Sequence, residues 1–359
     1  MIKKYQSYIY ALFLKYFLFI TFIFFCLILI INFFEEIKFS EKNNIDIYYS
    51  IYLSLLNAPS LIFEIFPFIF LITVKAFYLN LNDRNEIDIL KSNGISNLKI
   101  VFLLMLLSAI IGLFLLLFYY SFSSSLKSKY LDLKNRISNS NEYLAVVKED
   151  GLWVKEKIDN SVYFIHAEGF NKSDLKEITI SEIDKYYKNK NTITAEKANI
   201  ISKNWYLENV YLIDNSGNKN YYKSLVYNSS FNGEIISNLF SNLNSFNIYE
   251  LHTLSNSYSK IGYSNTDIKI HLNKIYSMPI FYILMTLLGF IIINKLKVFK
   301  SRFFIIILGV FISVVVYYLN YFSGVLGSKG AMPIHVSVWS PLLILFLICN
   351  IGILRVNEN

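Results

Sequence analysis

The sequence predicts an α-helical membrane protein with six transmembrane helices, three on each side of an inserted all-β, jelly-roll-like domain. Two observations predict this fold class. Hydrophobic residues make up 54% of the 359-residue chain, and several apolar runs reach the ~20 residues that a helix needs to cross a ~30 Å hydrocarbon core. Between the third and fourth runs lies a long polar stretch with the short, partly alternating segments of β-strands.

The first predicted domain, residues 1–122, contains three spans. Its apolar runs cover residues 11–34, 61–79 and 98–122. The first run is longer than the apolar part of a signal peptide and lacks a small-residue cleavage site, so we expect it to remain as a span.

The approach to the second span is more polar than the span itself. Residues 45–60 therefore predict a separate amphipathic helix, joined to the first span by a mixed-charge loop that contains Glu35, Glu36, Lys38, Glu41 and Lys42. Pro59 and Pro67 are expected to bend or punctuate this region, because proline removes a backbone donor from a helix.

The second predicted domain, residues 123–271, is rich in Asn, Ser, Lys, Tyr and Ile. Asp150-Gly151 indicates a β-hairpin, because this pair suits a turn with positive φ. Further short strand-like runs occupy residues 161–170, 191–201 and 204–227. Their spacing favours a β-sandwich or jelly roll of roughly 140 residues.

The third predicted domain, residues 272–359, restores the apolar pattern. Its spans cover residues 275–293, 303–322 and 336–354. Cys26 and Cys349 both lie in apolar runs, which indicates buried thiols rather than a disulfide framework.

Basic residues near the span ends predict the orientation, because Lys and Arg are retained on the cytoplasmic side. Four groups fall on one side: Lys3 and Lys4; Arg84, Lys91 and Lys99; Lys295, Lys297, Lys300 and Arg302; and Arg355. We therefore expect a multi-pass protein of the bacterial inner membrane, with both termini cytoplasmic and the β domain periplasmic.

Several function classes are disfavoured by the residue patterns. The formal charge of +8 comes from scattered lysines rather than from a basic stripe, which argues against nucleic acid as a partner. The sequence has no phosphate-binding glycine loop and no G-x-S-x-G motif, and its four histidines lack a metal-ligand spacing. We therefore predict a non-catalytic subunit without a cofactor or metal site.

Three charged residues lie inside apolar runs, where a charge is costly. Lys15 and Lys75 lie near cytoplasmic ends, so we expect them to extend along the helix toward water. Glu64 lies near the opposite end of the second span, and both an interface role and a functional role stay open for it.

A short charged segment between the second and third spans, residues 84–93, predicts a discrete cytoplasmic helix. Asp83 and Glu86 have the spacing of a capping box, and Asn93-Gly94 supplies a left-handed C-terminal stop. Ser96 is expected to cap the following span.

This short helix is too short to be stable alone in water, so it needs a surface to pack against. Ile87 and Leu90 share one side of it. One alternative is packing on the chain's own membrane ends. The other is a coupling helix that inserts into a groove of a separate subunit and offers Glu86 to a basic residue there.

The same segment, "NEIDILKSNGIS", resembles the signature that follows the second span in the LptF/LptG (YjgP/YjgQ) permeases of the lipopolysaccharide exporter. The stretches "FFEEIKF", "GLWVKEKIDNSVYFIHA", "KIYSMPIFYILMTLLGF" and "MPIHVSVWSPLLILFLI" are similar to other regions of that family. The resemblance extends over nearly the whole chain, and its weight lies in the combined architecture.

The resemblance implies a complex of LptF, LptG and two copies of the ATPase LptB. This complex extracts lipopolysaccharide from the inner membrane and passes it to the periplasmic proteins LptC and LptA. Glu86 matches the acidic position of the family's coupling helix, which places Ile87, Leu90 and Gly94 in the ATPase-coupling segment.

The motif "FFEEI" is more similar to LptG than to LptF. Family members of the G type often have a basic residue where this chain has Asn32, and Lys38 and Lys42 are the nearby substitutes for binding the lipid headgroup.

The predicted function is therefore a transmembrane permease subunit of a lipopolysaccharide-exporting ABC transporter. The first alternative is a membrane-anchored sensor or assembly scaffold whose β domain binds a periplasmic partner and transports nothing. The second is another large-domain permease, such as a lipoprotein releaser, although such proteins usually have four spans with the domain after the first.

Overall fold

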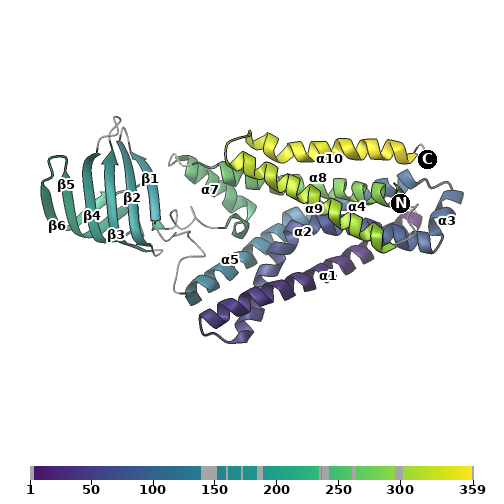
Figure 1. Cartoon of the computed structure of the whole chain (residues 1–359), viewed down its shortest axis with the longest axis horizontal. Coiled ribbons are helices and arrows are strands. Elements are labelled where there is room, and N and C mark those ends of the chain that lie inside the picture. The colour runs from purple at the N-terminus through teal and green to yellow at the C-terminus, as the bar shows by residue number, and fades with distance from the viewer. Residues whose placement is uncertain are drawn as a thin grey trace. The chain divides into compact units, whose positions relative to one another are not determined.

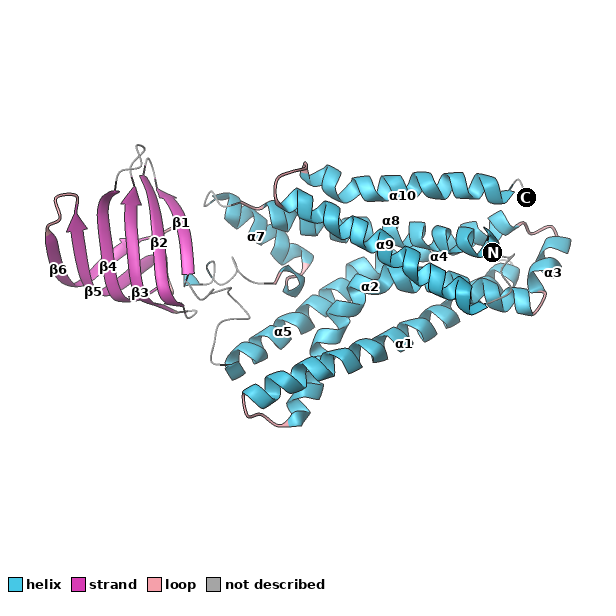
Figure 2. Ribbon diagram, viewed as in Figure 1, coloured by secondary structure: helices cyan, strands magenta, loops and turns pink. Residues whose placement is uncertain are grey.

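The computed structural model describes residues 4–138, 152–158, 161–170, 173–183, 189–233, 236, 242–260, 264–295 and 302–357 (Figures 1 and 2). The chain divides into two compact units. The membrane unit consists of Met1–Lys127 and Thr266–Asn359, and the β unit of Ser128–Asn265. Six helices in the described residues are long and apolar enough to cross a membrane, which confirms the predicted number of spans.

The first two helices are longer than the sequence patterns predicted. Helix α1 covers Lys4–Lys42 and α2 covers Ile47–Asp83. The predicted mixed-charge loop is wrong, because its residues form the last turns of α1. The predicted separate amphipathic helix is also wrong, because these residues are the first turns of α2. At 1.5 Å per residue each helix is over ~55 Å long, so it extends well beyond a ~30 Å hydrocarbon core.

Both prolines lie inside α2 without ending it. Pro59 and Pro67 are buried, and the Tyr119 hydroxyl donates a hydrogen bond to the Pro59 carbonyl at 3.1 Å. Packing of α2 against α1 and α8 keeps the helix continuous at the two prolines, where the low helix propensity of proline would otherwise interrupt it. Asn44, at φ 53°, makes the turn between α1 and α2, and the Ile45 amide donates to the Ser40 carbonyl across it.

The third span is made of three helical segments. These are α4 (Asn97–Phe114), the π-helical turn η1 (Leu115–Tyr119) and α5 (Tyr120–Ser138). The remaining helices of the membrane unit are α8 (Thr266–Lys295), α9 (Arg302–Ser328) and α10 (Ile334–Asn357).

Helix α8 is the central helix of the membrane unit, since it packs against α2, α4, α9 and α10. The rings of Phe70 and Tyr282 stack with centroids 4.9 Å apart, and Ser108 and Thr286 share a buried 2.8 Å hydrogen bond. Gly289 permits close approach to α2, because a Cβ there would lie 2.9 Å from the Leu71 carbonyl oxygen. Small and polar residues therefore join these helices, as is common in lipid.

The β unit contains one six-stranded antiparallel sheet in the order β1-β2-β3-β4-β5-β6 (Figure 1). Its strands are β1 (Leu152–Ile158), β2 (Ser161–Phe170), β3 (Asp174–Ile183), β4 (Asn189–Asn199), β5 (Asn204–Asp214) and β6 (Lys219–Asn228). The β prediction is confirmed, but the described strands follow the order of a meander rather than the Greek keys of a jelly roll. The predicted Asp150-Gly151 hairpin lies outside the described residues.

The β unit has its own apolar core on one face of the sheet. Trp205 is fully buried at its centre, and its indole N–H donates to the Phe231 carbonyl at 2.8 Å. The carboxylate of Glu156 is also buried, but it accepts hydrogen bonds from Tyr227, from Ser229 and from the Ser230 amide. A buried charge is tolerated where its acceptor sites are occupied in this way.

The unit also contains two helical segments that the sequence patterns did not predict. These are the 3₁₀ turn η3 (Leu243–Ser245) and α7 (Ile248–Lys260). Asn247 and Glu250 form a reciprocal capping box at the start of α7, with bonds of 2.8 and 2.9 Å.

Candidate functional site

The short helix α3 covers Glu86–Ser92, within the predicted range of 84–93. The predicted capping box is wrong, because α2 continues through Asp83 and Asn85 takes the N-cap position of α3. Asn85 has a left-handed conformation, with φ 57°, and its side chain makes no capping hydrogen bond. This kink turns the chain sharply from α2 into α3 and leaves the Glu86 carboxylate available to other elements.

The C-terminal end of α3 is as predicted. Gly94, at φ 77°, follows the helix; its amide donates to the Lys91 carbonyl at 2.9 Å, and the Ile95 amide donates to the Leu90 carbonyl at 3.0 Å. This is the Schellman arrangement, which requires the left-handed conformation that glycine adopts freely. Ser96 then caps α4 by accepting from the Lys99 amide at 3.3 Å.

Among the described residues, Glu86 makes polar contacts with two side chains. The Tyr8 hydroxyl of α1 donates to Glu86 Oε2 at 2.5 Å, and Arg84 Nη1 lies 3.8 Å from Glu86 Oε1. The Glu86 side chain is 24% exposed and the Arg84 side chain 60%, so the ion pair is strongly screened by water. The tyrosine contact was not predictable, because 78 positions separate the two residues.

The two faces of α3 differ in burial. Ile87 is buried against the chain itself and Leu90 is partly buried, whereas Asp88, Ile89 and Lys91 are exposed. Both arrangements considered from the sequence therefore have a basis, because one face packs on the protein and the other is open. Sequence reasoning missed Ile89, which is 58% exposed and is the large apolar side chain on the open face.

Helix α3 lies at the same end of the membrane unit as the beginning of α1 and the end of α10 (Figure 1). A shallow groove of about 380 Å³ is found at this end between α1 and α4, lined by Tyr5, Gln6, Leu98, Lys99, Phe102 and Leu103. Helix α3 is thus a short element with an open face, beside the first turns of α1 and α4.

The comparison with known families decides what kind of protein carries this helix. Residues 7–355 match the family described as lipopolysaccharide export system permease LptF/LptG. The chain belongs to the LptF/LptG family. A search of curated proteins found no match. Membership covers both units and identifies the chain as a lipopolysaccharide export permease of the LptF/LptG type, with helices suited to the inner membrane.

The predicted headgroup residues of this LptF/LptG permease do not form one site. Asn32 is 2% exposed, and its Oδ1 accepts from Asn57 Nδ2 at 3.1 Å. Lys127 donates to Asn57 Oδ1 at 2.6 Å, so the three side chains link α1, α2 and α5. Lys38 and Lys42 lie on the exposed side of α1, one helical turn apart and away from Asn32.

The charged residues inside the spans are arranged differently from expectation. Lys15 is exposed, but Lys75 is 1% exposed and its side chain fills the space beside Gly309 of α9, so Lys75 does not extend to water as predicted. Glu64 is partly buried and interacts electrostatically with Lys274 of α8. Lys274, which sequence reasoning missed, also lies over the Tyr321 ring at 5.9 Å.

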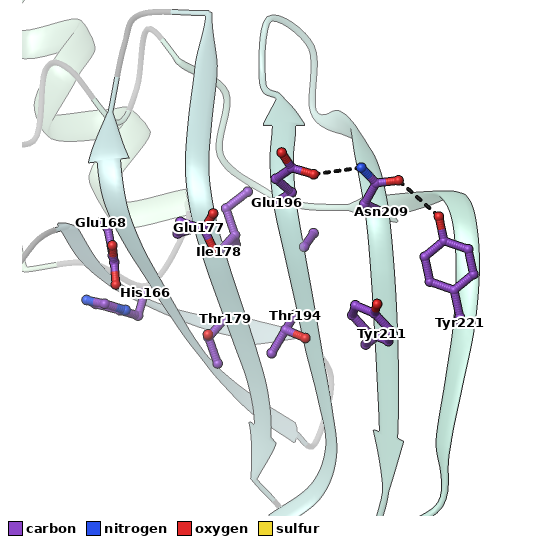
Figure 3. A pocket seen from close by; sticks show the side chains of 11 residues that line it. His166, Glu168, Glu177, Ile178, Thr179, Thr194, Glu196, Asn209, Tyr211 and Tyr221 are labelled. Atoms are coloured by element: carbon purple, nitrogen blue, oxygen red, sulfur yellow. Dashed lines mark hydrogen bonds between the residues drawn. The ribbon is translucent and has the colours of Figure 1, made fainter.

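The β unit carries a second candidate site, on the sheet face opposite the apolar core (Figure 3). One cross-strand row runs over all six strands and consists of Trp153, His166, Thr179, Thr194, Tyr211 and Tyr221. All of these residues except Trp153 line a cavity of about 800 Å³.

Three carboxylates from adjacent strands, those of Glu168, Glu177 and Glu196, line the same cavity. Asn209 donates to Glu196 at 2.6 Å and accepts from Tyr221 at 3.0 Å. Like charges on neighbouring strands make the cavity unfavourable for an anionic headgroup. No described residues form a group of three or more His, Cys, Asp or Glu side chains that could hold a metal.

Proposed function

We propose that this permease is a non-catalytic, LptG-like subunit of an ABC transporter that extracts lipopolysaccharide from the inner membrane. A dimer of the separate ATPase LptB supplies the energy, and a paralogous permease, LptF, completes the membrane part. The lipid then passes along the β unit to LptC and the LptA bridge. In this proposal both termini are cytoplasmic and the β unit, within the predicted residues 123–271, is periplasmic.

The observation that carries this proposal is the open face of α3 in a chain of this family. Glu86 begins the helix with its Oε1 3.8 Å from the exposed Arg84 guanidinium, and the apolar side chain of Ile89 projects from the same short element. A basic residue and an apolar groove on the ATPase would complement these two groups. Ile87, Leu90 and Gly94 hold the helix in shape from within the chain.

The need for an external energy source follows from the substrate. Each CH₂ of an acyl chain buried in the bilayer contributes ~0.8 kcal/mol, so a lipid with several chains does not leave the membrane spontaneously. Movement of α3 on ATP binding would tilt the spans and expel the lipid. Helices α1 and α9 are the exposed apolar surfaces of the membrane unit that would line its path.

Lys38 and Lys42 are our candidates for contacting the phosphates of the headgroup. Both lie one turn apart on the exposed side of α1, close to the end that we place in the periplasm. Two ammonium groups on one helix face attract phosphate electrostatically. Asn32 has a supporting role in this proposal, because its side chain is buried between helices.

Copurification with the soluble ATPase tests the proposal. We expect Glu86→Lys to lower recovery of the ATPase at least tenfold, because the substitution places a cation opposite a basic partner residue. The matched control is Glu41→Lys, which makes the same charge change at an exposed position in the last turn of α1, away from α3. Membrane insertion of each variant is measured alongside.

Equal recovery of the ATPase with both lysine variants would remove Glu86 from the interface. Recovery of no ATPase with the unaltered chain would instead favour the sensor or scaffold function.

A further inference from the structure

Tyr8 links α1 to the candidate coupling helix through one side-chain hydrogen bond. Its hydroxyl donates to Glu86 Oε2 at 2.5 Å, although Tyr8 itself is 40% exposed. A hydroxyl donor to a carboxylate makes a charge-assisted hydrogen bond, which is stronger than a neutral one and depends on direction. The bond therefore favours the orientation of the Glu86 carboxylate in which Oε2 faces Tyr8.

The second oxygen of Glu86 takes part in a loose ion pair, and the Glu86 side chain is 24% exposed. Oε1 has Arg84 at 3.8 Å, beyond hydrogen-bond distance, and the Arg84 side chain is 60% exposed. A carboxylate has about four acceptor sites, so one bond from Tyr8 does not prevent a second bond to an incoming cation. Tyr8 thus orients the carboxylate without occupying it.

The N-terminal end of α3 has little else to hold this side chain in place. Its N-cap residue, Asn85, makes no side-chain capping bond, and the helix has only seven residues. The anchor provided by Ile87 is apolar and without direction, so it fixes the helix but not the carboxylate.

We propose that Tyr8 is a positioning residue for the ATPase contact: its hydroxyl pre-orients Glu86 and makes the first turns of α1 move with α3. This inference rests on the proposed function, because it takes Glu86 as the group that the ATPase recognises. It extends the coupling element from one short helix to two segments that are far apart in the sequence. A displacement of α3 by the ATPase is transmitted directly to α1, whose last turns contain Lys38 and Lys42.

A double-mutant cycle on the full chain tests this role, with the permease pair in nanodiscs and the purified ATPase dimer added. We expect Tyr8→Phe to weaken the affinity for the ATPase by about fivefold, the effect of one hydrogen bond to a charged group. In a Glu86→Ala background the same substitution is expected to have no effect. In a Glu86→Gln background a smaller effect should remain, since the neutral amide oxygen still accepts from Tyr8.

The matched control is Tyr10→Phe, which removes a hydroxyl two positions along the same helix. Thermal unfolding of all variants is measured as well, and we expect Tyr8→Phe and Tyr10→Phe to unfold at the same temperature. The KM for ATP of the bound ATPase should not change, because Tyr8 acts on docking.

A photocrosslinker at Ile89 separates the possible failures. If Ile89 crosslinks to the ATPase while Tyr8→Phe binds as tightly as Tyr10→Phe, or more tightly than the unaltered chain, the role of Tyr8 is refuted and the proposed function stands. If the Tyr8 effect is the same in the Glu86→Ala background, Tyr8 acts independently of Glu86. If Ile89 crosslinks to no ATPase, the proposed function itself fails.

Discussion

The two units of this LptF/LptG permease place their apolar residues in opposite ways. The β unit gathers them into one core, with Trp205, Leu207 and Ile165 fully buried. The membrane unit leaves large apolar side chains exposed along two helices, among them Phe22 at 64% and Phe311 at 63%. The β unit thus buries its described apolar residues by itself, whereas the exposed apolar surfaces of α1 and α9 need lipid to cover them.

This difference has a physical origin in the solvent of each unit. In water, burial of apolar surface is the main driving force, so the sheet concentrates it on one face. In lipid that force is absent between helices, and hydrogen bonds and close backbone approach take its place. The Asn32–Asn57–Lys127 network and the contact at Gly289 are the corresponding features of the membrane unit.

The largest expected effect comes from emptying the core of the β unit. Trp205→Ala removes a fully buried ring and its hydrogen bond to Phe231, and should cost about 3–5 kcal/mol of unfolding free energy. Pulse proteolysis of the full chain in urea measures this, with Trp153→Ala, at an exposed indole, as control. Loss of the membrane helices at the same urea concentration would show that the two units are not independent.

A smaller effect is expected from the polar network of the membrane unit. Asn57→Ala removes the acceptor of Lys127 and the donor to Asn32, and we expect a loss of about 1 kcal/mol, the usual value for such bonds in lipid. Thermal unfolding in nanodiscs measures the change. Ser125→Ala is the control, because that hydroxyl donates to the Ser121 carbonyl of its own helix. Equal behaviour of the two variants would argue against polar bonds as the link between α1 and α2.

The smallest expected effect is a pH dependence confined to the β unit. Burial raises the pKa of Tyr227 above its ordinary value of 10.0, and the neighbouring Glu156 carboxylate raises this pKa further. Above about pH 10 the unfolded chain therefore loses a proton that the folded chain keeps, so stability falls as the pH rises. Urea denaturation at alkaline pH should show a shallower fall for Tyr227→Phe than for the unaltered chain. Parallel curves would show that this phenol does not contribute to the pH dependence.

The sequence predicted the features that depend on composition over about 20 residues or on a single turn. The number of spans and the presence of a β insert belong to the first kind, and Gly94 and Ser96 at the ends of α3 and α4 belong to the second. The start of α7 had a usable local signal as well, since Asn247 and Glu250 have capping-box spacing. The same spacing at Asp83 and Glu86 was misleading, because packing extended α2 through Asp83.

The sequence by itself determined the number of apolar spans and the existence of α3, because apolar length and helix-stop geometry are local properties. Only the tertiary structure decided that α2 continues through two prolines, that Ile87 faces inward while Ile89 stays open, and that Glu86 is bonded to Tyr8. These outcomes depend on contacts between residues far apart in the chain, whose combined free energy exceeds the local preferences of each segment. For this permease the candidate coupling residue Glu86 could be named from the sequence, and its hydrogen-bond partner Tyr8 could not.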